Sequence, residues 1–270
     1  MTALGIGCSP VFRRGSTQVL DYPYELSASG LLWLRADDCS NPVAAWPDKY
    51  SVFTDIAQGT GTRQPATGTG PNSQAIVDFD GVNTTGDVLI STATCPQNLD
   101  AYTLVYVGSR DDNKVYNSPI GIDASPASHG GNEDFGILTN ATQFLIGHNR
   151  SAGVDQQATV FATAGIPNTA TYYAMVITWR AGFTPTTYVN GAQTIAETTN
   201  AAWNQIATSG KELTVGIGFD NSTAYHNGKI AELILLNTRL TDLTDMWSYL
   251  QTRYALWLSD RTTELCLLSY

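Results

Sequence analysis

Apolar positions near the end of the chain change from a strand pattern to a helix pattern. From Ile230 to Leu236 the residues are apolar and β-favouring apart from Glu232, which predicts a strand packed mainly on one face. The next apolar residues have the helical spacing i, i+3, i+4, i+7 and i+11; they are Leu243, Met246, Trp247, Leu250 and Tyr254. Thr241 or Asp242 is the expected N-cap. We therefore predict one short C-terminal helix that follows a strand.

Short apolar segments separated by turn residues make up most of the remaining chain. The predicted strands are residues 31–34, 75–80, 103–108, 135–138, 143–147, 172–179 and 213–218. A further strand, 186–189, pairs with 172–179 and ends at Asn190-Gly191, a dipeptide that favours a two-residue hairpin. Residues 58–70 have the composition of a loop. Many strands with frequent turn signals predict an all-β fold, an antiparallel sandwich of two sheets.

The folded part is predicted to be a single domain, because none of the 270 residues marks a composition shift that would divide it. Residues 1–25 are interpreted as an N-terminal docking arm that needs a partner to order it, with a disordered tail as the alternative. The candidate contact residues of this arm are Phe12, Arg13 and Arg14. The domain then spans residues 26–258, and residues 259–270 form a C-terminal tail.

Charge and cysteine content restrict the possible partners and compartments. The formal net charge of −10 argues against a nucleic-acid partner, since that affinity rests on basic side chains. No apolar run approaches the ~20 residues that span a bilayer, so no membrane partner is expected. The start at Met1, without a secretory signal pattern, favours synthesis and assembly in the cytoplasm. The chain has four cysteines, Cys8, Cys39, Cys95 and Cys266. We expect them to be reduced, mostly buried thiols, with two disulfides as the alternative.

Several short motifs follow one another in a recognisable order. They are Trp33-Leu-Arg-Ala-Asp37, Trp46-x-Asp48, Arg63-Gln-Pro65, Val77-Asp-Phe-Asp-Gly81, Tyr102-Thr-Leu-Val-Tyr106, Tyr188-Val-Asn-Gly191, and Gly228-Lys-Ile-Ala-Glu232 before Leu240-Thr241 and the helix. In this order they resemble the laminin G-like branch of the concanavalin A-like lectin/glucanase superfamily, over roughly residues 28 to 257. The resemblance implies a jelly roll of two antiparallel sheets. It leaves function open, because the fold hosts lectins, enzymes, adhesion modules and virion proteins.

The acids of the Val77–Gly81 motif do not match the pattern that glycosidase chemistry requires. Retaining glycosidases need two carboxyls about 5 Å apart, and the nearest match is Asp78-Phe-Asp80-Gly-Val-Asn83. Its first acid is a shorter Asp and its last position an amide, which cannot act as a general acid. We therefore expect Phe79 to face the core and both aspartates to face solvent.

Other catalytic patterns are also missing from the sequence. There is no Gln-x-His strand of the alginate-lyase type and no Gly-x-Ser-x-Gly elbow. Solvated loop positions are predicted for the three histidines, His129, His148 and His226. Glu232 is expected to be a structural partner of loops or of the helix. The sequence thus predicts a protein that is not an enzyme.

Two kinds of ligand have candidate residues. No cofactor follows from the residues themselves, but the resemblance to laminin G-like domains makes Ca²⁺ a candidate; its potential ligands are Asp111, Asp112, Asp123 and Asp134. A sugar needs an aromatic platform beside amide and carboxylate groups. The stretches with this mixture supply Asp123, His129, Asn132, Asp134, Tyr225 and His226. Core positions are predicted instead for Trp33, Trp179 and Trp247.

The leading functional hypothesis is a non-catalytic structural or adhesion protein of a virion, such as a phage head decoration, head fibre or tail component. Its arm contacts other virion proteins, the chain forms a homo-oligomer within the assembly, and its lectin-like fold contacts cell-surface glycans. The particle is assembled in the host cytoplasm, with secretion or display at a cell surface as the alternative. A bacterial carbohydrate-binding module, or a polysaccharide-degrading enzyme on the same fold, is the alternative function.

Overall fold

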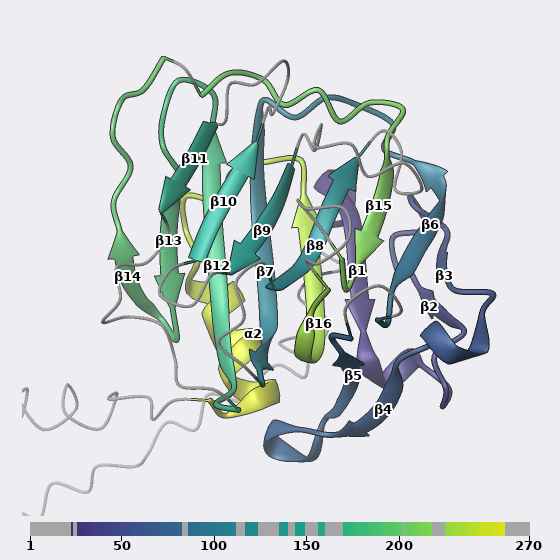
Figure 1. The fold of residues 1–270 in the computed structure, drawn as a ribbon. Coiled ribbons are helices and arrows are strands. Elements are labelled where there is room, and N and C mark those ends of the chain that lie inside the picture. Colours follow the sequence, from purple (N-terminus) through teal and green to yellow (C-terminus); the bar gives the residue numbers. More distant parts are fainter. Residues whose placement is uncertain are drawn as a thin grey trace, which may run out of the picture.

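The computed structural model describes residue 23 and residues 26–82, 86–111, 117–123, 135–139, 144–148, 156–159, 170–201, 203–217 and 225–256. These residues form two antiparallel sheets and one short α-helix (Figure 1). The predicted all-β sandwich with a C-terminal helix is therefore confirmed. The predicted docking arm lies outside the described residues except for residue 23, and so does the tail of residues 259–270.

Sheet A contains eight strands in the described part of the chain. In spatial order they are β14 (Ala192–Ile195), β13 (Thr186–Val189), β12 (Tyr173–Arg180), β7 (Ala101–Arg110), β16 (Asn227–Leu236), β5 (Ala75–Asp80) and β4 (Ala66–Thr69), and β1 (Gly30–Arg35) also pairs with β16. The predicted hairpin is present between β13 and β14, with φ values of 48° at Asn190 and 84° at Gly191. Positive φ at both positions is what a two-residue hairpin of this class requires.

Sheet B also contains eight strands among the described residues. Their order is β11 (Gln156–Thr159), β10 (Phe144–His148), β9 (Phe135–Thr139), β8 (Asn117–Asp123), β15 (Glu212–Val215), β6 (Leu89–Thr94), β3 (Asp55–Ala57) and β2 (Ala45–Pro47). A single-turn 3₁₀ helix, η2 (Ser27–Ser29), precedes β1, and three others lie between strands, namely η3 (Ala36–Asp38), η4 (Gly61–Arg63) and η5 (Pro71–Ser73). His148 ends strand β10 and so does not lie in the predicted loop.

The main core fills the space between the sheets. Alternate residues of each strand point inward, and those of sheet A include Leu104, Tyr106, Ile177 and Leu233, all 1% exposed or less. Sheet B contributes Ile120, Phe135, Leu213 and others to the same cluster. Trp179 lies here too, as predicted. The free thiols in the described part, Cys39 and Cys95, also contact this core.

Helix α2 (Thr244–Tyr254) covers part of the outer face of sheet A (Figure 1). Its buried residues pack against Trp33, Val105 and Ile234 of the sheet; those of the helix are Met246, Tyr249, Leu250, Arg253 and Tyr254. Trp247 is only partly buried, so its predicted place in the core is wrong. The side of the helix that carries Tyr249 packs against the sheet instead. The helix begins one residue later than predicted: its N-cap is Leu243, which makes no side-chain capping hydrogen bond, so the predicted N-cap at Thr241 or Asp242 is wrong. Asp242 Oδ1 still accepts a hydrogen bond from the Thr244 backbone N–H at 2.9 Å.

The helix covers only one part of this outer face. Along β5 and β7 the outward positions change from apolar Ile76 and Val107, which belong to the helix-covered cluster, to polar Asp78 and Ser109. The polar positions lie toward the end of sheet A where β16 begins. In the described part of the chain, no helix is long and apolar enough to cross a bilayer.

Candidate functional site

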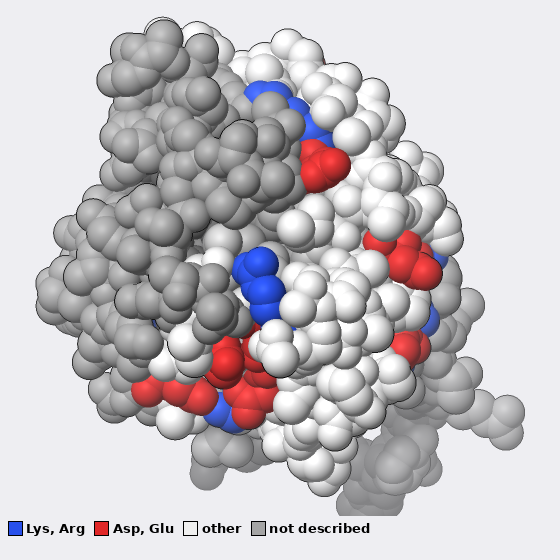
Figure 2. Space-filling model, turned by 45° about the vertical axis from the view of Figure 1, so that its right-hand side comes forward, with Lys and Arg blue, Asp and Glu red and all other residues white. Residues whose placement is uncertain are grey.

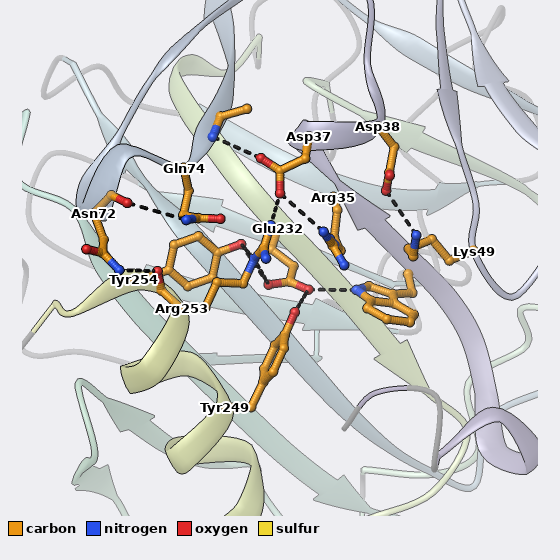
Figure 3. Close-up of polar contacts among 12 residues, drawn as sticks. Arg35, Asp37, Asp38, Lys49, Asn72, Gln74, Glu232, Tyr249, Arg253 and Tyr254 are labelled. Carbon is orange, nitrogen blue, oxygen red and sulfur yellow. Dashed lines mark hydrogen bonds and ion pairs between the residues drawn. The ribbon is translucent and has the colours of Figure 1, made fainter. Parts of the chain in front are cut away.

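Glu232 is a fully buried carboxylate between sheet A and α2 (Figure 3). Its Oε1 accepts hydrogen bonds from Trp33 Nε1 and from the Tyr249 hydroxyl, both at 2.6 Å, and its Oε2 accepts one from the Tyr254 hydroxyl at 2.7 Å. Burial raises the pKa of Glu232, while these three donors act in the opposite direction. Because α2 covers the carboxylate, Glu232 serves as the predicted structural partner of the helix.

A β-bulge in β16 explains why Glu232 faces the helix. Ile230 and Leu233 both belong to the core between the sheets, although strict alternation would place them on opposite faces. The register between β16 and β7 shifts between Ile230 and Glu232. The extra residue reverses the alternation, so that Ala231 and Glu232 both lie on the side of α2.

Ion pairs extend this buried cluster to neighbouring loops. Arg253 pairs with Asp37 of η3, and its Nε lies 3.9 Å from Glu232 Oε2. Asp37 also accepts hydrogen bonds from Arg35 at 3.3 Å and from the Ala75 backbone N–H at 3.1 Å. These contacts fasten the C-terminal end of α2 to the sheet (Figure 3). The cluster holds the fold and offers no open site.

The uncovered end of the outer face of sheet A carries a second group of polar side chains. We call it the sheet A polar patch and define it as Asp78 on β5, Ser109 and Asp111 at the end of β7, Tyr172 before β12, and Lys229 on β16. Lys229 lies directly opposite Asp78 on one neighbouring strand and Ser109 on the other. The strand order thus brings together residues that are up to 151 positions apart, from Asp78 to Lys229.

Lys229 is the charged centre of the patch. Its Nζ pairs with Asp111 and lies 3.7 Å from Asp78 Oδ1. Burial alone would lower the pKa of Lys229, but the hydrogen bond and charge of Asp111 and the charge of Asp78 outweigh it and raise that pKa. Burial raises the pKa of Asp78, against the effect of Lys229. The ammonium therefore stays protonated between the two carboxyl groups.

One polar atom of the patch, Asp111 Oδ1, is buried and has no hydrogen-bond partner among the described residues. Ser109 is 0% exposed, and its side chain forms a hydrogen bond with Tyr172. Burial also raises the pKa of the half-buried Tyr172, on which Lys229, Asp111, Asp78 and Ser109 all act. The Asp78 side chain is 43% exposed. The patch thus combines unused hydrogen-bonding capacity with an accessible surface.

A third polar group lies where β5 and β6 are connected. The Asp80 backbone N–H donates to Asp87 Oδ2 at 3.0 Å, and the Asp87 backbone N–H donates to Asp80 Oδ1 at 3.2 Å. Arg63 donates to the Tyr225 hydroxyl at 3.1 Å. Burial, with the charges of Asp80 and Asp78, raises the pKa of Asp87 to about 6. These acids are engaged in holding the connection.

The prediction that Tyr225 and His226 form an exposed aromatic platform is wrong. Tyr225 is 6% exposed and packs with Val88 and Ile217, and His226 is 2% exposed. The His226 ring contacts Phe79 edge-on, with centroids 5.7 Å apart. Aromatic packing has buried both side chains, and His226 is not the solvated histidine that was expected.

The other candidate residues fall into separate places. Asp111 belongs to the sheet A polar patch. Asp123 ends β8 in register with Glu212, whereas the opposite end of β8 bridges to Tyr225 through Ser118. The five residue steps from Ser118 to Asp123 span roughly 17 Å. The remaining candidates lie outside the described residues: Phe12, Arg13, Arg14, Asp112, His129, Asn132 and Asp134. Within the described part, no group of three or more His, Cys, Asp or Glu could hold a metal ion.

Charge on the molecular surface is sparse. In the face shown in Figure 2, most of the described surface is uncharged, and acidic side chains form small groups close to basic ones. This agrees with a chain in which only 14% of residues are charged. The described part of this face shows no broad basic area of the kind that phosphate recognition requires.

Comparisons with known proteins identify the fold class. The chain is similar to the binding domain of Paraclostridial Mosquitocidal Protein 1, with a TM-score of 0.61 and 11% identity over 84% of this chain and 53% of that structure. It is also similar to the receptor binding domain of botulinum neurotoxin mosaic serotype C/D, with a TM-score of 0.53 and 12% identity over 83% of this chain and 51% of that one.

A third similar structure is the binding domain of botulinum neurotoxin DC in complex with rat synaptotagmin II. Its TM-score is 0.51, with 12% identity over 87% of this chain and 53% of that structure. The chain therefore spans about half the length of the solved structures it matches. No protein-family model and no curated protein matches the sequence. The likeness defines a β-sandwich of the kind found in receptor-binding domains.

Proposed function

We propose that the chain is a non-catalytic binding domain that recognises a glycan receptor at a cell surface. The observation that carries the proposal is the likeness of its sandwich to the binding domains of the mosquitocidal protein and of botulinum neurotoxins. The resemblance of its ordered motifs to laminin G-like domains, a lectin-type fold, points in the same direction. Fold likeness alone leaves the ligand open, so the chemistry of the surface has to support it.

The acidic side chains support binding over catalysis. Glu232 is fully buried and accepts three hydrogen bonds. Asp78 and Asp111 share the ammonium of Lys229, and Asp80 and Asp87 accept backbone hydrogen bonds from each other. A glycosidase needs one carboxyl free to give a proton and another free to attack or to activate water. These five acids are engaged in contacts that compete with both roles.

The finer part of the proposal is that this domain is an adhesion component of a virus particle, present in several copies. Residues 1–25 would attach it to neighbouring virion proteins. Leu26 and Leu256, at the two ends of the described chain, both pack against the cluster beside α2. The terminal segments therefore begin on the same side of the domain, beside α2, which suits attachment through that part of the domain.

Glycan binding by the full-length chain tests the general proposal. We expect the chain to bind at least one oligosaccharide on a glycan array. Binding should be the same in the presence of EDTA. An array without any bound oligosaccharide, with or without Ca²⁺, would rule out glycan recognition.

Deletion of residues 1–25 tests the virion proposal. The expected result is a domain with unchanged thermal unfolding that no longer enters particles. Normal incorporation of the truncated chain would contradict the docking role of the arm.

A further inference from the structure

The sheet A polar patch combines three features that a ligand could use. Asp111 Oδ1 is a buried acceptor without a donor among the described residues. An unmade hydrogen bond at a buried group is costly. Tyr172 adds a half-buried ring at the border of the patch, and Asp78 adds a carboxyl that solvent reaches.

The charges of the patch select against ions. Lys229 already lies between Asp78 and Asp111, in the position where a divalent cation would have to bind two carboxylates, and it repels such a cation. Two carboxylates and one ammonium leave one negative charge, and the whole chain carries −10. An anionic ligand is therefore disfavoured as well. A neutral ligand avoids both penalties.

We propose that the sheet A polar patch binds a neutral sugar residue. The inference rests on the proposed function and names its site. A pyranose offers hydroxyl donors for Asp111 and Asp78, hydroxyl oxygens that accept from Lys229, and a C–H face for the Tyr172 ring. This pairing of one apolar face with a few convergent polar groups is the usual composition of a small-molecule site.

Single substitutions on the full-length chain test the site. Tyr172→Ala removes the ring, and Asp78→Asn removes the exposed charge while keeping the shape of the side chain. Tyr188→Ala is the matched aromatic control, because Tyr188 is a half-buried tyrosine that packs beside Trp247 of α2. Asp55→Asn is the matched acid control, because Asp55 is an exposed aspartate on β3 of the other sheet.

The probe is a set of immobilised neutral oligosaccharides ending in glucose, galactose, mannose or N-acetylglucosamine, with sialylated and sulfated versions of each. We expect the wild type to prefer neutral members. Tyr172→Ala should weaken binding by up to about tenfold and Asp78→Asn by several-fold, while both controls bind like the wild type. EDTA should change none of these results.

The possible outcomes distinguish a failure of the proposed site from a failure of the proposed glycan-binding function. If the wild type binds neutral glycans and both patch variants bind them equally well, the site is wrong although glycan recognition stands. Preference for anionic glycans, or loss of binding with EDTA, would also overturn the proposed site. If the wild type binds no glycan at all, both proposals fail. Matching melting temperatures of the four variants exclude unfolding as the cause of a loss.

Discussion

Glu232 and Asp87 are buried acids whose carboxylates meet different partners. Burying a carboxylate costs several kcal/mol, and each hydrogen bond to a charged group returns about 1.5 to 3 kcal/mol. Glu232 has three side-chain donors, so the free energy gained from its hydrogen bonds is similar in size to the cost of burying its carboxylate. Such a cluster adds little net stability, but it is sensitive to the loss of any one member.

Substitution of Glu232 should therefore destabilise the domain. We expect Glu232→Ala to lower the free energy of unfolding by about 3 to 5 kcal/mol, because it leaves Trp33 Nε1 and two tyrosine hydroxyls without their acceptor. Tyr249→Phe removes a single donor and should cost about 1 to 2 kcal/mol. Urea denaturation of the purified variants measures both. An unchanged unfolding free energy in Glu232→Ala would show that the cluster does not hold α2.

Asp87 makes stability depend on pH. Its pKa in the folded chain is about 6, above the ordinary value of 3.8, so the folded state binds this proton more tightly than the unfolded state. Stability from this group is thus greatest below about pH 4 and is lost as the pH rises toward 6. The raised pKa values of Asp48, Asp78 and Glu232 act with the same sign.

The substitution Asp87→Asn isolates this contribution. The amide oxygen can still accept the hydrogen bond from Asp80, but the group no longer titrates. Unfolding free energies measured between pH 4 and 7 should fall less steeply in the variant than in the wild type. Parallel curves for the two proteins would contradict a raised pKa at Asp87.

Among the secondary-structure elements, those with long apolar runs could be predicted from the sequence. β7, β12 and β16 are buried along most of their length, and their sequences show it directly. β4 has the sequence Ala-Thr-Gly-Thr with no buried residue, so its composition indicates a loop. It is a strand because it pairs with β5, and pairing across the sequence has no local signal.

Helix α2 could be predicted from its spacing, but its rotation against the sheet could not. The sequence pattern does not distinguish Trp247 from Tyr249 as the inward residue. Tyr249 is selected because its hydroxyl reaches Glu232, and Glu232 faces the helix only because of the bulge in β16. A single-residue change of register is invisible in the period-two pattern of a strand.

The orientation of α2 can be tested by truncating one fully buried and one partly buried side chain. Leu250→Ala should cost about 3 kcal/mol of unfolding free energy, and Trp247→Ala about 2 kcal/mol or less, although tryptophan is the larger residue. Chemical denaturation gives both values. A greater loss for Trp247→Ala would mean that the helix turns its tryptophan toward the sheet.

For the molecule as a whole, the sequence predicts the class of fold better than the place of its sites. The sandwich follows from strand and turn patterns, whereas the sheet A polar patch joins four strands whose order is set by packing. Asp111 was named as a candidate, but Ser109, Tyr172 and Lys229 were missed. The available signal was a charged residue, Lys229, directly before the apolar run that begins at Ile230.

The same limit applies to Tyr225 and His226. Their loop-like sequence context indicated exposure, yet they pack against Phe79, Val88 and Ile217. Their burial depends on strands that the local sequence does not reveal. Sequence patterns indicate which residues are suited to burial, whereas the order of the strands determines which residues are actually buried.

Hydrogen–deuterium exchange of the full-length chain tests the central claim most directly. The exchange is measured with and without the neutral oligosaccharide that binds most tightly on the array. We expect slower exchange in peptides that contain residues 75–80, 107–111, 171–174 and 227–231, which carry the sheet A polar patch, and unchanged exchange around β8 and β9. Protection confined to β8 and β9, or absent from the whole chain, would contradict a glycan-binding domain with its site on sheet A.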